Sequence, residues 1–182
     1  RNIDYLAMLT PRLTEEACKL MRGYNGHTKV VYIPNFLTCF PENVSAAVRE
    51  KTVLAAGRLT EVKRFDLLIE QFAHIHEREP EWKLRILGEG EDRAKLEEQI
   101  TKLGAGDYIM LTGRKNGDEV EREMLSASIF AMSSRSEGFP FVLMEAQSCG
   151  LPIIAYDVRV GPGAVVHDGE DGVLVPEGER RQ

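Results

Sequence analysis

Two glutamates stand in a segment that is otherwise mostly apolar or small. The stretch SRSEGFPFVLMEAQSCG places Glu137 just before a predicted helix and Glu145 inside it. A solvated helix face normally carries several charges of both signs, whereas the residues between these two glutamates carry no charge. Three interpretations are open: a carboxylate pair that binds a ligand, a catalytic acid and base, or two unrelated surface groups.

A group of cations follows the apolar run TVLAA. In the next segment, GRLTEVKRFD, Gly57 leaves room for the close approach of a ligand, and Arg58, Lys63 and Arg64 gather around the start of a predicted helix. Positive charge beside the free N–H groups of a helix N-terminus favours an anion. The alternative is that these three side chains are ordinary surface cations.

The loop RSEGFPF has features of a second anion-binding segment. Gly138 allows a sharp bend, and Pro140 suits the first turn of a helix, so free backbone N–H groups would face the ends of the strands. Glu145 lies about 8 Å beyond Pro140 along the helix axis, at ~1.5 Å per residue. An anion here would have Glu137 on one side and Glu145 on the other. Carboxylates accept hydrogen bonds from hydroxyls, so a phosphorylated polyol such as a sugar nucleotide fits this arrangement.

Two further glycine-containing loops carry weaker signals. The segment GEGEDR suggests a dinucleotide-binding fingerprint, but Arg93 stands where the third glycine is required, so we interpret it as a tight turn. The segment TGRKNGDE contains Arg114. It either presents backbone groups to a base edge or is a turn that ends in an Asp118 helix cap.

These loops need elements that hold them at one edge of a sheet. Apolar runs of strand length alternate with stretches of helical periodicity, as in the helix predicted around Phe65, Ile69 and Phe72. The expected strands cover 3–10, 29–34, 52–57, 83–88, 108–113, 128–133 and 151–156. Near-continuous apolar strands between amphipathic helices predict an α/β fold, a parallel sheet covered on both faces. In such sheets the ligand lies beyond the carboxyl ends of the strands.

Composition excludes several classes of protein. The chain has 182 residues, 43% of them hydrophobic and 29% charged, as in a soluble globular domain without a membrane-spanning segment. A net charge of −6 argues against nucleic-acid binding. Cys18, Cys39 and Cys149 are far apart, which favours a reducing compartment. His74 and His76 point to different helix faces, so no metal site is expected.

Four motifs in this order resemble a known family. The segments GRLTEVKRFD, LRILGEGED, LTGR and SRSEGFPFVLMEAQSCGLPII are similar to the nucleotide-sugar-binding half of group 1 (family 4) retaining glycosyltransferases. The resemblance runs from about residue 4 to residue 175 and implies a Rossmann-like parallel sheet that forms one half of a GT-B fold. Arg64 departs from the pattern because a glycine is common there, and Ala164 stands where an acidic residue is usual.

The resemblance implies a role for each site residue. Arg58 and Lys63 would contact the donor diphosphate, and Glu137 would accept hydrogen bonds from the donor sugar. These three form the expected catalytic set. Glu145 would bind the ribose, and Arg114 would lie by the base. The remaining expected substrate-binding residues are Gly57, Gly138, Phe139, Pro140, Phe141 and Leu143.

The resemblance also implies a domain organisation. Residues 1–35 would be the tail end of an N-terminal acceptor domain, 36–51 a linker, and 52–182 a nucleotide-sugar-binding domain truncated before its closing helices. We expect a fragment that binds a nucleotide-diphosphate sugar, most simply a UDP-sugar, for retaining transfer of a hexosyl group. The acceptor would be a glycan, a lipid-linked molecule or a polysaccharide, and the fragment alone would be inactive.

The cofactor and the partners follow from the same resemblance. No cofactor and no metal are expected, since the sugar nucleotide is a substrate and side-chain cations meet its phosphates. We expect a cytoplasmic protein, with association of the full-length protein with the inner face of a membrane left open. Two alternatives remain: a glycoside hydrolase that uses Glu137 and Glu145 as acid and base, and a nucleotide-sugar epimerase or non-catalytic nucleotide-sugar-binding domain.

Overall fold

Six parallel strands form the main sheet. The structure is a computed structural model that describes residues 3–22, 27–37, 41, 44 and 49–176. The strands are β3 (Thr52–Ala56), β4 (Lys83–Leu87), β5 (Ile109–Gly113), β6 (Ile129–Met132), β7 (Ile153–Asp157) and β8 (Gly172–Pro176). Their order is β5-β4-β3-β6-β7-β8, and all neighbours are parallel. The predicted parallel sheet is therefore confirmed, and β8 is a strand that the sequence pattern did not predict.

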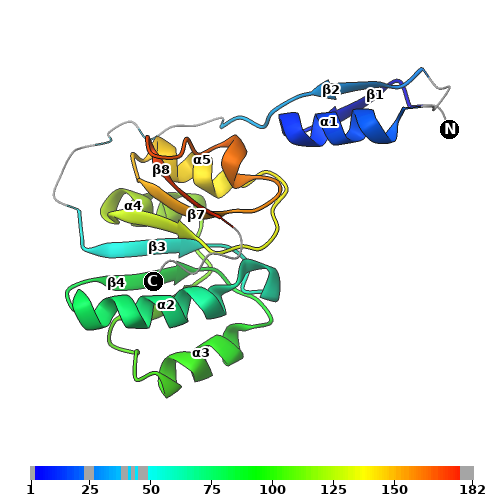
Figure 1. The fold of residues 1–182 in the computed structure, drawn as a ribbon. Helices are drawn as coiled ribbons and strands as arrows, with labels where there is room; N and C mark the ends of the chain where they lie inside the picture. The colour runs from blue at the N-terminus through cyan, green and yellow to red at the C-terminus, as the bar shows by residue number, and fades with distance from the viewer. Residues whose placement is uncertain (1–2, 23–26, 38–40, 42–43, 45–48, 177–182) are drawn as a thin grey trace.

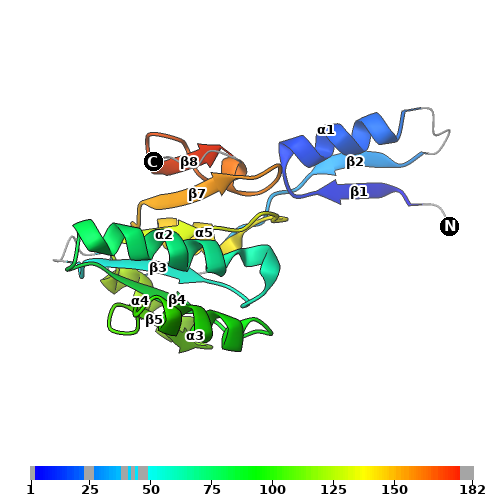
Figure 2. The same cartoon turned by 60° about the horizontal axis from the view of Figure 1, so that its bottom comes forward.

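Helices cover both faces of this sheet (Figures 1 and 2). Adjacent residues of β3 point to opposite faces: Leu54 packs in one buried cluster and Ala55 in the other. The Ala55 side is covered by α2 (Phe65–Arg78) and α3 (Arg93–Lys102), and the Leu54 side by α4 (Gly117–Ser126) and α5 (Phe141–Ser148). Helices on both faces were predicted, and they are confirmed.

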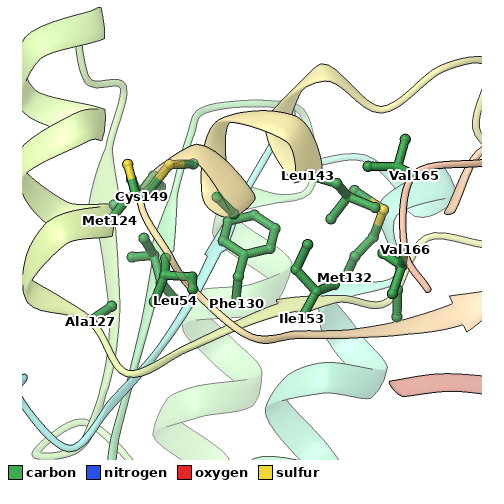
Figure 3. Close-up of a cluster of buried hydrophobic side chains, with 14 residues drawn as sticks. Leu54, Met124, Ala127, Phe130, Met132, Leu143, Cys149, Ile153, Val165 and Val166 are labelled. Atoms are coloured by element: carbon green, nitrogen blue, oxygen red, sulfur yellow. The ribbon is translucent and has the colours of Figure 1, made fainter. Parts of the chain in front are cut away.

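Figure 3 shows the cluster beneath α4 and α5. Phe130 of β6 and Ile153 of β7 are fully buried there and contact a cluster that includes Leu143 of α5. Ile75 near the end of α2 is 51% exposed, and Leu103, which follows the last residue of α3, is 43% exposed. The buried face of α2 therefore ends at Phe72, whereas that of α3 extends to Ile100 in its last turn.

A smaller unit precedes the main sheet (Figure 1). It consists of β1 (Tyr5–Met8), α1 (Pro11–Leu20) and β2 (Lys29–Tyr32), with β1 and β2 parallel. Helix α1 begins at Pro11, a residue that suits the first position of a helix. The Thr10 side chain caps it by accepting a hydrogen bond of 3.2 Å from the N–H of Leu13. The Arg159 guanidinium contacts the carboxylate of Glu16 on α1 at 2.8 Å, which links this unit to the loop after β7.

The end of the connecting segment is fixed to the main domain by Arg49. Its guanidinium donates hydrogen bonds to the carbonyl oxygens of Met124, Ala127 and Cys149, near the C-terminal ends of α4 and α5. A cation is favourable at these helix ends because their carbonyl groups lack intrahelical partners. Much of the predicted linker, with Cys39, lies outside the described residues.

Candidate functional site

The order in which strands are added to the sheet reverses at β3, and this places a crevice between β3 and β6. Strands β4 and β5 follow β3 on one side, and β6, β7 and β8 lie on the other. Ligands of open α/β sheets bind at such a point, outside the carboxyl ends of the strands. A cleft of about 640 Å³ lies there. Its walls come from the loops after β3, β4, β5 and β6 and from the first two turns of α5.

Most of the predicted site residues line this cleft. They are Gly57, Arg58, Lys63, Arg114, Glu137, Phe139, Pro140, Phe141 and Glu145. The cleft is also lined by side chains that are not among the predicted site residues, including Glu89, Lys115 and Val120. Lys115 follows Arg114 directly in the sequence, so the dipeptide itself was the signal for this second cation.

Two predicted residues lie elsewhere. Gly138 is exposed beside the cleft, and a Cβ atom placed there would meet no atom within 4 Å. Leu143 is fully buried, and its side chain packs in the cluster of Figure 3. Its backbone N–H donates to the Pro140 carbonyl at 3.0 Å. We therefore correct the expectation that the Leu143 side chain meets substrate: it holds α5 on the sheet.

The glycines of GEGEDR let two loops pack backbone against backbone. A Cβ atom at Gly88 would lie 1.9 Å from the carbonyl oxygen of Gly57, and one at Gly90 would lie 2.2 Å from that of Leu59. The N–H of Leu59 donates to the carbonyl of Glu89 at 2.9 Å. The loop after β4 therefore supports the cation-bearing loop after β3, and this contact explains both glycines without a dinucleotide.

Lys63 and Glu137 meet inside the cleft. Lys63 ends a short 3-10 turn, η1 (Glu61–Lys63), and its Nζ lies 2.5 Å from Oε1 of Glu137. The side chains are 23% and 10% exposed, so both are largely shielded from solvent. The hydroxyl of Ser133 donates to the Lys63 carbonyl at 2.8 Å, which ties η1 to the loop after β6. Sequence reasoning assigned separate ligand groups to the two side chains and did not identify this pair or Ser133.

Gly161 packs directly against the side chain of Glu137. It lies in the loop after β7 with φ +116°, a conformation that favours glycine. A Cβ atom at this position would lie 2.8 Å from Cβ of Glu137 and 3.1 Å from Cδ of Pro140. Ala164, which departs from the family pattern, is exposed at the end of the following 3-10 turn, η2 (Pro162–Ala164). The segment GPG was the only sequence signal for this contact.

The N-terminus of α5 opens toward the cleft. Pro140 is the N-cap residue, one position before the predicted first turn, and no side chain caps this helix end. The first N–H groups of a helix have no intrahelical partner, and here they belong to Phe141 and Val142, which line the cleft. The rings of Phe139 and Phe141 pack edge to face, with centroids 6.1 Å apart. This end of α5 can therefore receive an anion beside an aromatic wall.

The remaining charges of the cleft differ in their surroundings. Arg58 and Arg114 are exposed and form no ion pair within the part of the chain that the structure describes. Glu145 stands on the accessible side of α5, but the surrounding protein removes part of its hydration, and this burial raises the pKa of its carboxyl. Free cations and a partly desolvated carboxylate in one cleft suit a ligand that carries both phosphates and hydroxyls.

Two further findings concern metals and membranes. Among the described residues, no group of three or more His, Cys, Asp or Glu side chains is placed to hold a metal ion. No helix in the described ranges has the length and apolar character needed to cross a bilayer.

Relatives and solved structures match this chain over most of its length. The UDP-N-acetylglucosamine–peptide N-acetylglucosaminyltransferase GtfA subunit of Streptococcus parasanguinis is 40% identical over 161 residues, which cover 85% of this chain and 31% of the relative. The amylovoran biosynthesis glycosyltransferase AmsD of Erwinia amylovora is 36% identical over 129 residues, covering 71% and 35%. The pneumococcal O-GlcNAc transferase GtfA, solved with UDP and GlcNAc, superposes with a TM-score of 0.84 at 30% identity, covering 96% and 34%.

The comparisons agree with the fold and identify the family. The chain spans about a third of the length of these relatives. The sheet is one half of a GT-B fold, as the sequence predicted. The family profile described as glycosyl transferases group 1 matches residues 40–182, which is most of the chain. The protein therefore belongs to the group 1 glycosyl transferases.

Proposed function

We propose that the cleft binds a UDP-sugar and that this chain is the donor-binding half of a retaining hexosyltransferase. The observation that carries the proposal is the meeting, in one cleft, of the cations Arg58 and Lys63, the uncapped N-terminus of α5, and the carboxylates Glu137 and Glu145. Uridine is favoured over other bases because the matched relative is named for UDP-N-acetylglucosamine and the matched structure holds UDP. The acceptor would be a glycan, a lipid-linked molecule or a polysaccharide.

Each group in the cleft has a role in this proposal. Arg58, Lys63 and the first N–H groups of α5 receive the diphosphate, since charge-assisted hydrogen bonds to phosphate are strong. Glu145 accepts hydrogen bonds from the ribose hydroxyls, and Glu137 accepts them from the sugar. The loop of Arg114 lies by the base. Backbone groups from 138 to 140 approach the sugar phosphate, where Gly138 leaves open space.

The chemistry proposed for this half is charge stabilisation. As the bond between the sugar and the diphosphate breaks, negative charge grows on the leaving phosphate. Fixed cations and helix N–H groups stabilise that charge without reorganisation. Because side chains supply the positive charge, the reaction needs no divalent metal. Neither glutamate transfers a proton in this scheme.

The domain assignment is part of the proposal. We assign residues 1–35, which include β1, α1 and β2, to the end of an acceptor domain, 36–51 to the linker, and 52–182 to the donor domain. The chain alone would bind the donor without transferring sugar, because catalysis needs a bound acceptor and the exclusion of water by domain closure. Incubation with labelled UDP-sugars and an acceptor mixture tests this part, and efficient transfer by the chain alone would contradict it.

Calorimetric titration with UDP, GDP and their sugars tests the donor site. We expect UDP to bind, and Arg58→Ala to weaken that binding by roughly 1.5 to 3 kcal/mol, the range for hydrogen bonds to charged groups. Arg135→Ala is the matched control, since Arg135 pairs with Glu61 at 3.1 Å and does not line the cleft. Equal UDP affinity in the wild type and Arg58→Ala would remove the anion site. Binding of a free oligosaccharide but of no nucleotide would favour a hydrolase.

A further inference from the structure

The cleft contains cations that are already paired with carboxylates, Lys63 among them, and others that are free. Nζ of Lys63 lies 2.5 Å from Glu137, whereas Arg58 and Arg114 form no ion pair within the described part of the chain. The Glu137 side chain is only 10% exposed, so its carboxylate depends on Lys63 for much of its stabilisation. A ligand that takes the Lys63 ammonium must therefore also satisfy Glu137.

Glu137 has little freedom to withdraw from the cleft. Gly161 lies so close behind it that one added carbon would stand 2.8 Å from the Glu137 Cβ. The loop that carries Glu137 is held to η1 by the backbone hydrogen bond of 3.0 Å from Arg135 to Val62 and by the Ser133 hydroxyl on Lys63. When an anion reaches Lys63, the Glu137 carboxylate therefore remains close to that anion.

We propose that Glu137 is a counter-anion of Lys63 and that a nucleotide diphosphate must compete with Glu137 for the ammonium. Only the donor that carries its sugar offers Glu137 new hydrogen bonds in return. This inference rests on the proposed donor site. A bare diphosphate brings negative charge to Lys63, so Glu137 must share or lose the ammonium and gains no hydroxyl donor in exchange. A complete sugar nucleotide places hydroxyl donors next to the same carboxylate.

The pair of Lys63 and Glu137 consequently makes the cleft selective for the intact sugar nucleotide over its product, UDP. Glu137 repels free UDP and competes with it for Lys63, whereas it accepts hydrogen bonds from the sugar of the intact donor. Once the sugar has been transferred, Glu137 loses those donors and pairs again with Lys63, which favours the departure of the diphosphate. Weak retention of the product follows from the same contact that recognises the substrate.

The test is calorimetric titration of the 182-residue chain and its variants with UDP. Glu137→Gln keeps the shape of the side chain and removes its charge, so we expect UDP to bind about three- to tenfold more tightly than to the wild type. Glu137→Asp, which is too short to keep the contact with Lys63, should change UDP affinity in the same direction. Glu61→Gln is the control, because Glu61 pairs with Arg135 outside the cleft, and it should leave UDP affinity unchanged.

A double-mutant cycle distinguishes competition between Glu137 and UDP for Lys63 from simple repulsion between Glu137 and the UDP phosphates. In a Lys63→Gln background, the gain from Glu137→Gln should shrink at least twofold, because no ammonium is left to release. An equal gain in both backgrounds, or unchanged or weaker UDP binding by Glu137→Gln, would overturn the inference while the donor site stands. Failure of the wild-type chain to bind UDP would overturn the proposed function and this inference together.

Discussion

Substitution of Gly161 by alanine should damage both the fold and the donor site. The residue has φ +116°, and a side chain held in such a backbone conformation costs about 1 to 3 kcal/mol. The new methyl group would lie 2.8 Å from Cβ of Glu137 and 3.1 Å from Cδ of Pro140. Overpacking of this kind costs about 1 to 3 kcal/mol more. We therefore expect Gly161→Ala to lower the free energy of unfolding by about 2 to 6 kcal/mol.

Urea denaturation measures that loss, and Gly138→Ala is the matched control. Gly138 lies beside the same cleft, has no positive φ, and has open space where its Cβ would stand. Its replacement should change stability by less than about 0.5 kcal/mol and yet weaken the binding of a UDP-sugar, if the backbone there approaches the ligand. Equal stability of Gly161→Ala and the wild type would refute the contact with Glu137.

Three further predictions concern the backbone, pH and metals. The backbone of Arg64 has a left-handed conformation, with φ 51°. In urea denaturation the Arg64→Gly variant should therefore be about 1 kcal/mol more stable than the Arg64→Ala variant. The reverse order would contradict backbone strain at this position. Burial raises the pKa of Glu145 above 4.5, so ionisation costs stability as pH rises through the interval between the unfolded and folded pKa values. Glu145→Gln should then raise the melting temperature more at pH 7 than at pH 4, and an equal rise at both would argue against desolvation. EDTA should leave the calorimetric affinity for UDP unchanged, and a loss restored by Mg²⁺ would reveal a metal in the site.

The sequence by itself determined the layers of the fold and the loops that carry the site. Buried parallel strands are nearly continuous apolar runs, so β3, β4, β6 and β7 could be identified locally. Strand β8 was missed because it lies at the edge of the described sheet, beside β7, and Val173 there is 39% exposed. The N-cap of α4 was also placed two residues late: Asn116, and not Asp118, forms the capping box with Glu119.

Only the tertiary structure decided which groups meet within the site. Lys63 and Glu137 are 74 residues apart, and their pairing depends on β3 and β6 being neighbours in the sheet. Gly161 supports Glu137 because the loop after β7 returns to the same edge. Leu143 and Glu145 are two residues apart on one helix, yet one is buried against the sheet and the other faces the cleft. Residue types and spacing specify local structure, whereas contacts between distant loops arise from strand order, which a local pattern does not contain.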